Sequence, residues 1–267
     1  MVMATYLDRI LEAHRAEMAR DDRDLDVLAA RAKASGPVRG FATALRRPDE
    51  VTVIAEVKRA SPSKGPLAPD LDPAEVARTY QASGAAALSV LTDHHFFAGS
   101  PDDLAVARAA TRLPVLRKDF TVGPADVLDA RSMGADAVLL IAAALLPDEI
   151  PQLMALAASV GLDSLVEVHD EGEAERALVS GATLIGVNQR DLTTFEVDPA
   201  RAAREAGMLP AEVIRVAESG IRDGDDVRRL GDAGFDAVLV GEALVTAADP
   251  GDALRELQSG ARSRAGR

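Results

Sequence analysis

The hydrophobic pattern of the chain changes near residue 50. Over residues 5–48, apolar side chains recur at the three- and four-residue spacing of amphipathic helices. The apolar members of the two segments are Leu7, Ile10 and Leu11, then Leu25, Val27, Leu28 and Ala32. This spacing predicts a helical N-terminal extension over residues 1–48.

After the extension, short runs rich in β-branched residues predict eight strands. The runs are Val51–Val57, Ala86–Leu91, Pro114–Phe120, Ala137–Ala143, Ser164–Val168, Leu184–Asn188, Ile214–Ala217 and Ala237–Val240. Because polar and apolar residues do not alternate within them, the runs are typical of parallel strands covered on both faces. Intervening segments begin with acidic residues and end with glycine, as capped helices do.

A glycine repeat supports a serial array of strand-helix units. Gly84, Gly134, Gly181 and Gly234 each precede a predicted strand, at intervals of 47 to 53 residues. Eight such units predict an α/β fold of the (β/α)8 TIM-barrel class. A doubly wound open sheet is the competing architecture, but no G-x-G-x-x-G follows the first strand.

Composition and charge indicate the expected cellular compartment and exclude some classes of partner. The net charge of −13 repels nucleic acids, so no nucleic-acid partner is expected. The longest apolar run, Ala137–Leu146, falls short of the ~20 residues that span a bilayer, and the N-terminal residues lack an apolar stretch of signal-peptide length. The chain has no cysteine, which fits a reducing cytoplasm. We expect a single cytoplasmic domain over residues 1–267 with no membrane partner and a disordered tail at 259–267.

Charged and amide side chains recur where predicted strands end. The residues are Glu56 and Lys58, Lys118, Glu167, Asn188 and Arg190, and Glu218 with Ser219. In a barrel the carboxyl ends of the strands meet at one rim, where catalytic groups lie. Any one of these residues is equally compatible with a solvated strand end or a structural ion pair. Together they favour an active site, because buried charges of both signs are costly unless they pair.

The residue types at this rim suggest acid-base chemistry. The pKa of a lysine falls with burial or beside another cation, so Lys58 or Lys118 is suited to proton donation or Schiff-base formation. Glu56 and Glu167 are candidates for a base and an orienting group. No His, Asp and Glu trio shows metal-ligand spacing, so no metal is implied. For the histidines His94, His95 and His169 we expect surface or loop roles.

Glycines after the last two strands indicate a phosphate site. Ser219, Gly220 and Gly241 begin the loops that in barrels bind phosphate through backbone N–H groups, although such glycines also serve plain turns. The stretch Ser61-Pro62-Ser63-Lys64-Gly65 offers hydroxyls and a cation near them. It is either a lid over the phosphate or an ordinary polar turn.

Six motifs give the chain a family resemblance. They are EVKRASPSKG, VLTDHHFFAGS, VLRKDF, LVEVHDEGE, IGVNQRDLTTFEVD and VAESGI, in this order. With them, nearly the whole chain resembles the indole-3-glycerol phosphate synthases of tryptophan biosynthesis. The resemblance implies a carboxy-lyase that closes the indole ring of 1-(2-carboxyphenylamino)-1-deoxyribulose 5-phosphate, releasing carbon dioxide and water without a cofactor. It also implies a small phosphorylated substrate as partner and a monomer or weak homodimer.

The resemblance assigns roles to the five residues expected to be catalytic. Lys118 is the general acid that protonates the substrate ketone, and Glu167 is the base or proton shuttle of the later dehydration. Lys58 pairs with the anthranilate carboxylate, and Glu56 orients the lysines and the substrate hydroxyls. Asn188 hydrogen-bonds a substrate hydroxyl.

The resemblance also implies a set of residues that bind the substrate. They are Ser61, Phe97, Phe120, Arg190, Glu218, Ser219, Gly220, Gly241 and Glu242. The two phenylalanines wall the aromatic ring, and Arg190 and Ser61 fix substrate and phosphate. The sugar-phosphate end is lined by Ser219, Gly220, Gly241 and Glu242, and Glu218 is a further member of the set.

The chain departs from the family pattern after KDF. The family usually continues with an acidic residue and a Tyr-Gln pair, whereas this chain has Gly123-Pro124-Ala125-Asp126. We expect this loop to pack or move differently. Gln189 stands where the family often has a second asparagine, and His94-His95 replaces a mixed polar stretch.

Three other functions remain as alternatives at this point. Phosphoribosylanthranilate isomerase is a related phosphate-binding barrel, but the combination of Lys58, Lys118 and Glu167 argues against it. A Schiff-base aldolase would use Lys118 as nucleophile. A catalytically silent barrel would need none of these charges.

Overall fold

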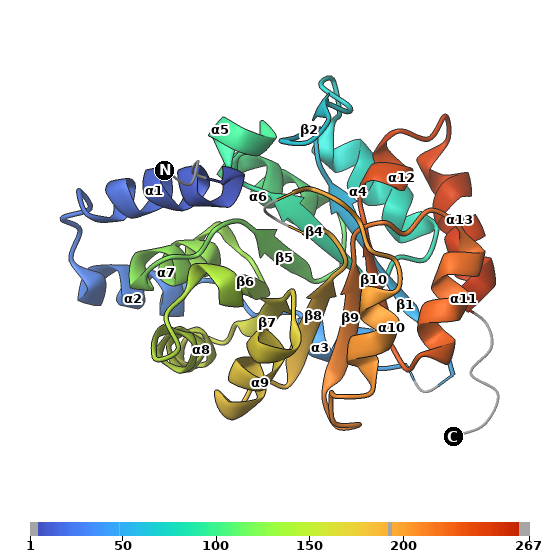
Figure 1. Cartoon of the computed structure of the whole chain (residues 1–267). Helices are drawn as coiled ribbons and strands as arrows, with labels where there is room; N and C mark the ends of the chain where they lie inside the picture. The colour runs from blue at the N-terminus through green and yellow to red at the C-terminus, as the bar shows by residue number, and fades with distance from the viewer. Residues whose placement is uncertain (1–4, 48, 192–193, 262–267) are drawn as a thin grey trace.

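Eight parallel strands close into a barrel (Figure 1) in the computed structural model, which describes residues 5–47, 49–191 and 194–261. Around the barrel the strand order is β1-β10-β9-β8-β7-β6-β5-β4, with every neighbouring pair parallel. The strands are β1 (Thr52–Val57), β4 (Ala87–Leu91), β5 (Val115–Lys118), β6 (Ala137–Ile141), β7 (Asp163–Val168), β8 (Leu184–Asn188), β9 (Ile214–Glu218) and β10 (Ala237–Val240). The predicted (β/α)8 barrel is confirmed, and the open sheet is excluded.

Helices surround the strands. The outer helices are α4 (Pro73–Ala82), α6 (Pro101–Ala110), α7 (Pro124–Met133), α8 (Glu149–Ser159), α9 (Glu171–Val179), α10 (Arg201–Ala206), α11 (Gly224–Asp232) and α13 (Pro250–Ala261). Acidic side chains cap several of them; Asp72, for example, accepts the N–H groups of Ala74 and Glu75. Gly134 ends α7 with φ of 96°, a left-handed conformation that explains the repeated glycine before the strands.

Smaller elements lie at the end of the barrel at which the strands finish. They are the hairpin of β2 (Ala60–Ser61) and β3 (Gly65–Pro66), the short helices α5 (His94–Phe97) and α12 (Glu242–Val245), and the 3-10 turn η1 (Ala142–Ala144). The hairpin contains the Ser61-Pro62-Ser63-Lys64-Gly65 stretch.

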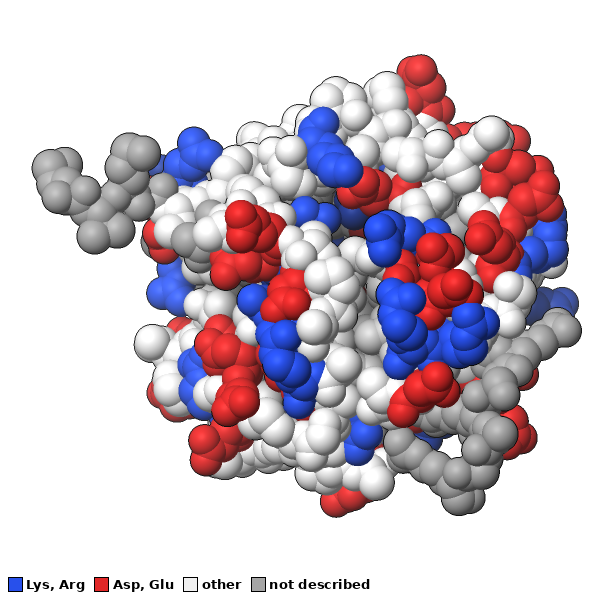
Figure 2. Space-filling model, turned by 45° about the vertical axis from the view of Figure 1, so that its right-hand side comes forward, with Lys and Arg blue, Asp and Glu red and all other residues white. Residues whose placement is uncertain are grey.

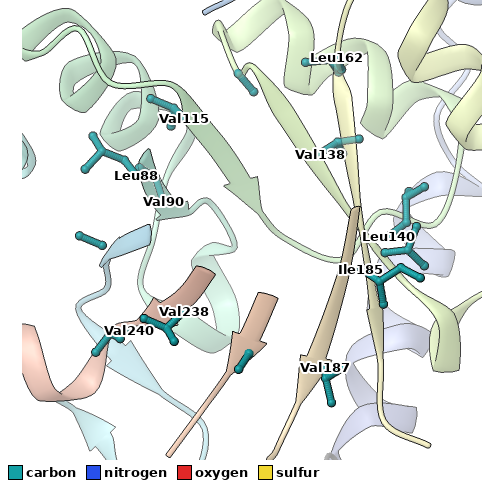
Figure 3. Close-up of a cluster of buried hydrophobic side chains, with 14 of the residues drawn as sticks. Leu88, Val90, Val115, Val138, Leu140, Leu162, Ile185, Val187, Val238 and Val240 are labelled. Atoms are coloured by element: carbon teal, nitrogen blue, oxygen red, sulfur yellow. The ribbon is translucent and has the colours of Figure 1, made fainter. Parts of the chain in front are cut away.

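Side chains of each strand alternate between two apolar layers. In β6, Val138 and Leu140 belong to the layer between strands and helices (Figure 3), while Leu139 and Ile141 belong to the barrel interior. All four are buried, with at most 3% of their surface exposed. Burial on both faces explains why the strand sequences show no polar alternation.

Three N-terminal helices form the predicted extension: α1 (Tyr6–Met18), α2 (Leu25–Ala34) and α3 (Phe41–Leu45). Phe41 and Leu45 are fully buried in the interior layer, and the backbone N–H of Ala42 donates to Asp163 at the start of β7. α3 therefore closes the end of the barrel at which the strands begin.

The second helix buries only part of its predicted apolar set. Leu28 and Ala32 of α2 are buried, whereas Leu25 and Val27 are 46% and 64% exposed. Helical spacing locates the helix correctly but does not tell which apolar residues find a partner.

Helix α1 is tied to the barrel at three points. His14 Nε2 lies 3.0 Å from Asp93 Oδ2, and Arg15 donates to the backbone oxygen of Ala144 at 2.8 Å. Met18 packs so closely on Gly123 that a Cβ there would lie 2.5 Å from the Met18 sulfur. The loop after KDF thus packs against α1.

The C-terminal helix is longer than predicted. α13 continues through Ala261, so the expected disordered tail does not begin at residue 259. The rest of that prediction, residues 262–267, lies outside the described residues. Across the described chain, no helix has both the length and the apolar character needed to cross a membrane.

The glycine at position 99 is expected to resist substitution. A Cβ at Gly99 would lie 2.2 Å from the backbone oxygen of Leu91, an atom that cannot move without disturbing β4. Gly99→Ala should lower the free energy of unfolding by ~1–3 kcal/mol, measured by urea denaturation. Gly36→Ala is the control, because nothing lies within 4 Å of a Cβ there. Equal stability of the two variants would contradict this packing.

The tie between α1 and the barrel should depend on pH. Burial lowers the pKa of His14, but the hydrogen bond to Asp93 and the charge of Asp119 outweigh it and raise the pKa. The stabilisation is therefore complete below the unfolded pKa and is lost as pH rises through the folded pKa.

Replacing His14 tests this dependence directly. His14→Gln should lower the free energy of unfolding by ~1–2 kcal/mol at pH 6 and by less at pH 9. His94→Gln, the same change at an exposed residue, should have little effect at either pH. A His14→Gln deficit that is larger at pH 9 would refute the assignment.

Candidate active site

The strands end at a cavity of about 500 Å³, and all fourteen residues predicted for the site line it. They are Glu56, Lys58, Ser61, Phe97, Lys118, Phe120, Glu167, Asn188, Arg190, Glu218, Ser219, Gly220, Gly241 and Glu242. On the face seen in Figure 2, acidic and basic side chains are intermingled, without an uninterrupted basic surface.

Lys118 lies at the centre of the charged groups. It is the last residue of β5, and its Nζ lies 3.0 Å from Glu167 Oε2 and 3.7 Å from Glu218 Oε2. Burial alone lowers the pKa of the lysine, but Glu167, Glu218 and Glu56 attract the cation and raise the pKa above its usual range. Lys118 is therefore an ammonium ion at neutral pH, and the lowered pKa that the sequence suggested for a lysine at this rim is not found for Lys118.

Glu167 receives partners on both carboxylate oxygens. Oε2 contacts Lys118, and Oε1 accepts a hydrogen bond of 3.0 Å from Asn188 Nδ2 on the neighbouring strand β8. Burial by itself raises the pKa of Glu167, but Lys118, His169 and Asn188 together lower it below its usual range. A carboxylate and an ammonium group thus meet in a buried, mutually neutralising pair.

A second ion pair forms at the end of β1. Lys58 Nζ lies 2.6 Å from Glu56 Oε1, and Ser89 Oγ donates to Glu56 Oε2 at 3.3 Å. Gly241 provides the space, because a Cβ there would lie 2.3 Å from Glu56 Oε1 and 3.0 Å from Lys58 Nζ. Glycine at position 241 is thus explained by room for this pair.

Glu218 is in a different electrostatic state. Within the described chain its buried Oε1 has no hydrogen-bond partner, and Gly186 makes room for it. Burial, then repulsion by Glu167, raises the pKa of Glu218 to about 8 despite the nearby Lys118. Glu218 is therefore a neutral acid at pH 7, which leaves the two ammonium groups balanced by two carboxylates.

Further polar groups line the cavity around the residues predicted to bind phosphate. Ser61 Oγ is buried and has no hydrogen-bond partner among the described residues. Ser219 and Gly220 follow one another with φ of 67° and 73°, a left-handed turn that is unusual for a serine. Lys64 and Arg190 reach the same region, with Nζ of Lys64 2.5 Å and Nη2 of Arg190 3.9 Å from Glu242.

Apolar groups form another wall of the cavity. The rings of Phe97 and Phe120 have centroids 6.3 Å apart. Helix α1 adds Tyr6, Leu7 and Ile10, which sequence analysis did not assign to the site. The amphipathic pattern of α1 was the available signal, but it did not tell which surface the apolar face would cover.

The prediction for His169 holds only in part. The residue lies in the loop between β7 and α9, as expected, but its imidazole is 11% exposed and lies between Glu167 and Glu173. The spacing of these residues, two and four positions from His169, was the signal that sequence analysis missed. His94 and His95 are exposed, as predicted.

One group of side chains has the composition of a metal site although the sequence spacing implied none. Ligand atoms of His14, Asp93 and Asp119 lie within 4.8 Å of one another. Their oxygens already have protein partners: Asp93 Oδ1 accepts the N–H of Phe96 at 2.6 Å, and Asp119 Oδ2 accepts from Arg117 at 3.0 Å. The group therefore serves as a bridge between α1 and the barrel.

Comparison with known proteins agrees with this geometry. The family model described as indole-3-glycerol phosphate synthase matches residues 7–257. The chain is 52% identical to the indole-3-glycerol phosphate synthase of Mycolicibacterium smegmatis, over 96% of this chain and 95% of that one. It is also 52% identical to indole-3-glycerol phosphate synthase 2 of Streptomyces coelicolor, over 91% and 93% of the two chains.

A more distant structural likeness concerns the fold alone. Thiamine phosphate pyrophosphorylase from Pyrococcus furiosus superposes with a TM-score of 0.61 at 20% identity, over 79% of this chain and 96% of that one. The match over nearly the whole chain, together with these relatives, shows that the chain belongs to the indole-3-glycerol phosphate synthase family.

Proposed function

We propose that this chain performs the family's ring closure with Lys118 as general acid and Glu167 as general base or proton shuttle. The observation that carries the proposal is the buried contact of 3.0 Å between the two groups, in a cavity with an apolar wall on one side and unpartnered polar groups on another. The substrate, 1-(2-carboxyphenylamino)-1-deoxyribulose 5-phosphate, combines an aromatic ring with a phosphate and suits both.

Ring closure begins with Lys118. The ring carbon that bears the carboxylate attacks the ketone carbon, a carbon–carbon bond forms, and the ketone oxygen takes a proton from the lysine ammonium. Loss of carbon dioxide returns the electrons of the carbon–carboxylate bond to the ring. The ammonium form of Lys118 at neutral pH supplies the proton that this step needs.

Dehydration then requires a base near the same atoms. Glu167 takes the proton released as the second ring becomes aromatic, and passes it toward the departing hydroxyl group. Its carboxylate form at neutral pH and its contact with Asn188, which also binds a substrate hydroxyl, suit this task.

The remaining residues hold the substrate. Lys58 pairs with the anthranilate carboxylate, and Glu56, already 2.6 Å from Lys58, orients that ammonium. Neutral Glu218 is able to donate a hydrogen bond to an anionic substrate without repelling it. Phe97 and Phe120 contact the aromatic ring.

The phosphate lies at the other end of the cavity. Ser61, whose hydroxyl has no protein partner within the described chain, contributes a donor together with Arg190. Ser219, Gly220 and Gly241 offer backbone N–H groups, with Glu242 at the edge of this region.

Purified protein should convert the substrate to a fluorescent indole product without added metal, and equally in the presence of a chelator. Lys118→Ala and Glu167→Gln should each lower kcat by ~10²- to 10⁴-fold, because each removes an acid or a base. Lys33→Ala, at an exposed lysine of α2, should leave kcat unchanged. Absence of turnover in the parent protein would reject the proposal.

The pKa of Glu218 leads to a second kinetic prediction. Above pH 8 the carboxyl group ionises and repels the anionic substrate, so kcat/KM should fall as pH rises through about 8. Glu218→Gln keeps a neutral donor and should remove this alkaline limb, while Glu218→Ala should lower kcat/KM at every pH. An alkaline limb that persists in Glu218→Gln would show that another group causes it.

A further inference from the structure

His169 lies between two carboxylates just beyond β7. Its Nε2 lies 3.2 Å from Glu167 Oε1 and makes no aligned hydrogen bond within the described chain, so this contact is an ion pair. Its Nδ1 lies 3.0 Å from Glu173 Oε2 on α9. The imidazole therefore connects the proposed base to a second carboxylate outside the cavity.

The start of α9 fixes this second carboxylate. Glu173 Oε2 also accepts the backbone N–H of His169 at 2.8 Å, and the N–H of Glu173 donates to Asp170, the N-cap residue, at 2.8 Å. Only 12% of the Glu173 side chain is exposed, so water competes little with His169 for its carboxylate. Because Glu173 is held on both sides, the imidazole has one defined orientation.

We propose that His169 is a positioning residue: as a cation held by Glu173, it fixes Glu167 and keeps that carboxylate ionised during the reaction. This inference rests on the proposed role of Glu167. His169 is not among the residues that line the cavity, so it acts through Glu167 and not on the substrate.

The charge of His169 follows from its surroundings. Burial alone lowers the pKa of the imidazole, but the contacts with Glu167 and Glu173 outweigh burial and raise the pKa to about 10. The ring therefore carries a positive charge throughout the neutral range, and both ring nitrogens bear protons.

A second cation becomes important when Lys118 has given up its proton. At that moment the lysine is neutral, and it lies 3.0 Å from Glu167. Without another positive charge, the proton affinity of Glu167 would rise before the dehydration step requires a base. His169 remains charged on the other carboxylate oxygen, so Glu167 stays available to accept a proton from the intermediate.

Other charged groups face this pair. Lys118 from β5 and Glu218 from β9 surround Glu167, with Asn188 of β8 as a neutral donor. Glu205 of α10 is close enough to His169 for its own pKa to be affected by the imidazole. Only Lys118 and His169 among these groups contribute positive charge to Glu167.

The first test measures protonation without relying on turnover. The chain has four histidines, so ¹⁵N spectra of the imidazoles are simple to assign, with His169→Asn identifying the signal. In the parent protein, the His169 ring should remain doubly protonated through pH 8. A His169 ring that becomes neutral below pH 7 overturns the proposal, whether or not the protein turns over the substrate.

The second test follows the chemical step in single turnovers over a range of pH. His169→Asn should slow this step by about 10-fold and move the acidic limb of its pH–rate profile upward by about one pH unit or more. The steady-state KM should stay within about 2-fold of the parent value. Glu173→Gln should move the limb in the same direction by less, because the imidazole remains. Glu175→Gln, at an exposed glutamate of the same helix, is the matched control and should not change the profile.

A merely structural role would give a different result. In that case His169→Asn would lower the melting temperature or the rate, yet the acidic limb would coincide with that of the parent, and the proposal would be wrong. If His169→Asn does not fold, the Glu173→Gln profile decides: an unshifted limb there equally overturns the proposal. Absence of turnover in the parent would instead reject the proposed function.

Discussion

The buried contact between Lys118 and Glu167 is the interaction on which the site depends. Two charges removed from water are tolerated only when they neutralise one another and their remaining donors and acceptors are satisfied. Lys118 also faces Glu218, and Glu167 also faces Asn188 and His169, so neither group is left with one partner. This mutual dependence keeps an ammonium group and a carboxylate within 3.0 Å of one another.

The barrel wall is shaped around these charges. Gly186 and Gly241 lie where a Cβ would meet Glu218 Oε1 at 2.2 Å and Glu56 Oε1 at 2.3 Å. Three carboxyl groups therefore fit into one cavity because a glycine, which has no side chain, lies beside two of them. Burial, then repulsion by Glu167, raises the pKa of Glu218, so that one carboxyl group remains protonated while Lys58 and Lys118 balance the others.

The N-terminal extension also contributes to the cavity. Helix α3 closes the barrel where the strands begin, and α1 contributes Tyr6, Leu7 and Ile10 to the cavity at the other end. The bridge from His14 to Asp93 and the contact of Met18 with Gly123 hold α1 there. An apolar wall for an aromatic substrate thus comes from a segment that precedes the barrel.

The eight strands, the barrel class and the residues at the strand ends could be predicted from the sequence, because apolar runs, helix caps and glycine turns are signals that act over a few residues. The exposure of Leu25 and Val27 in α2 and the neutral state of Glu218 follow from packing in the folded chain and could not be predicted from the sequence. Likewise, only the fold placed His169 against Glu167. Lys118, which contacts the same carboxylate group, lies 49 positions before Glu167 in the chain. Burial and the approach of charges depend on barrel closure and helix packing, which bring together residues far apart in the chain.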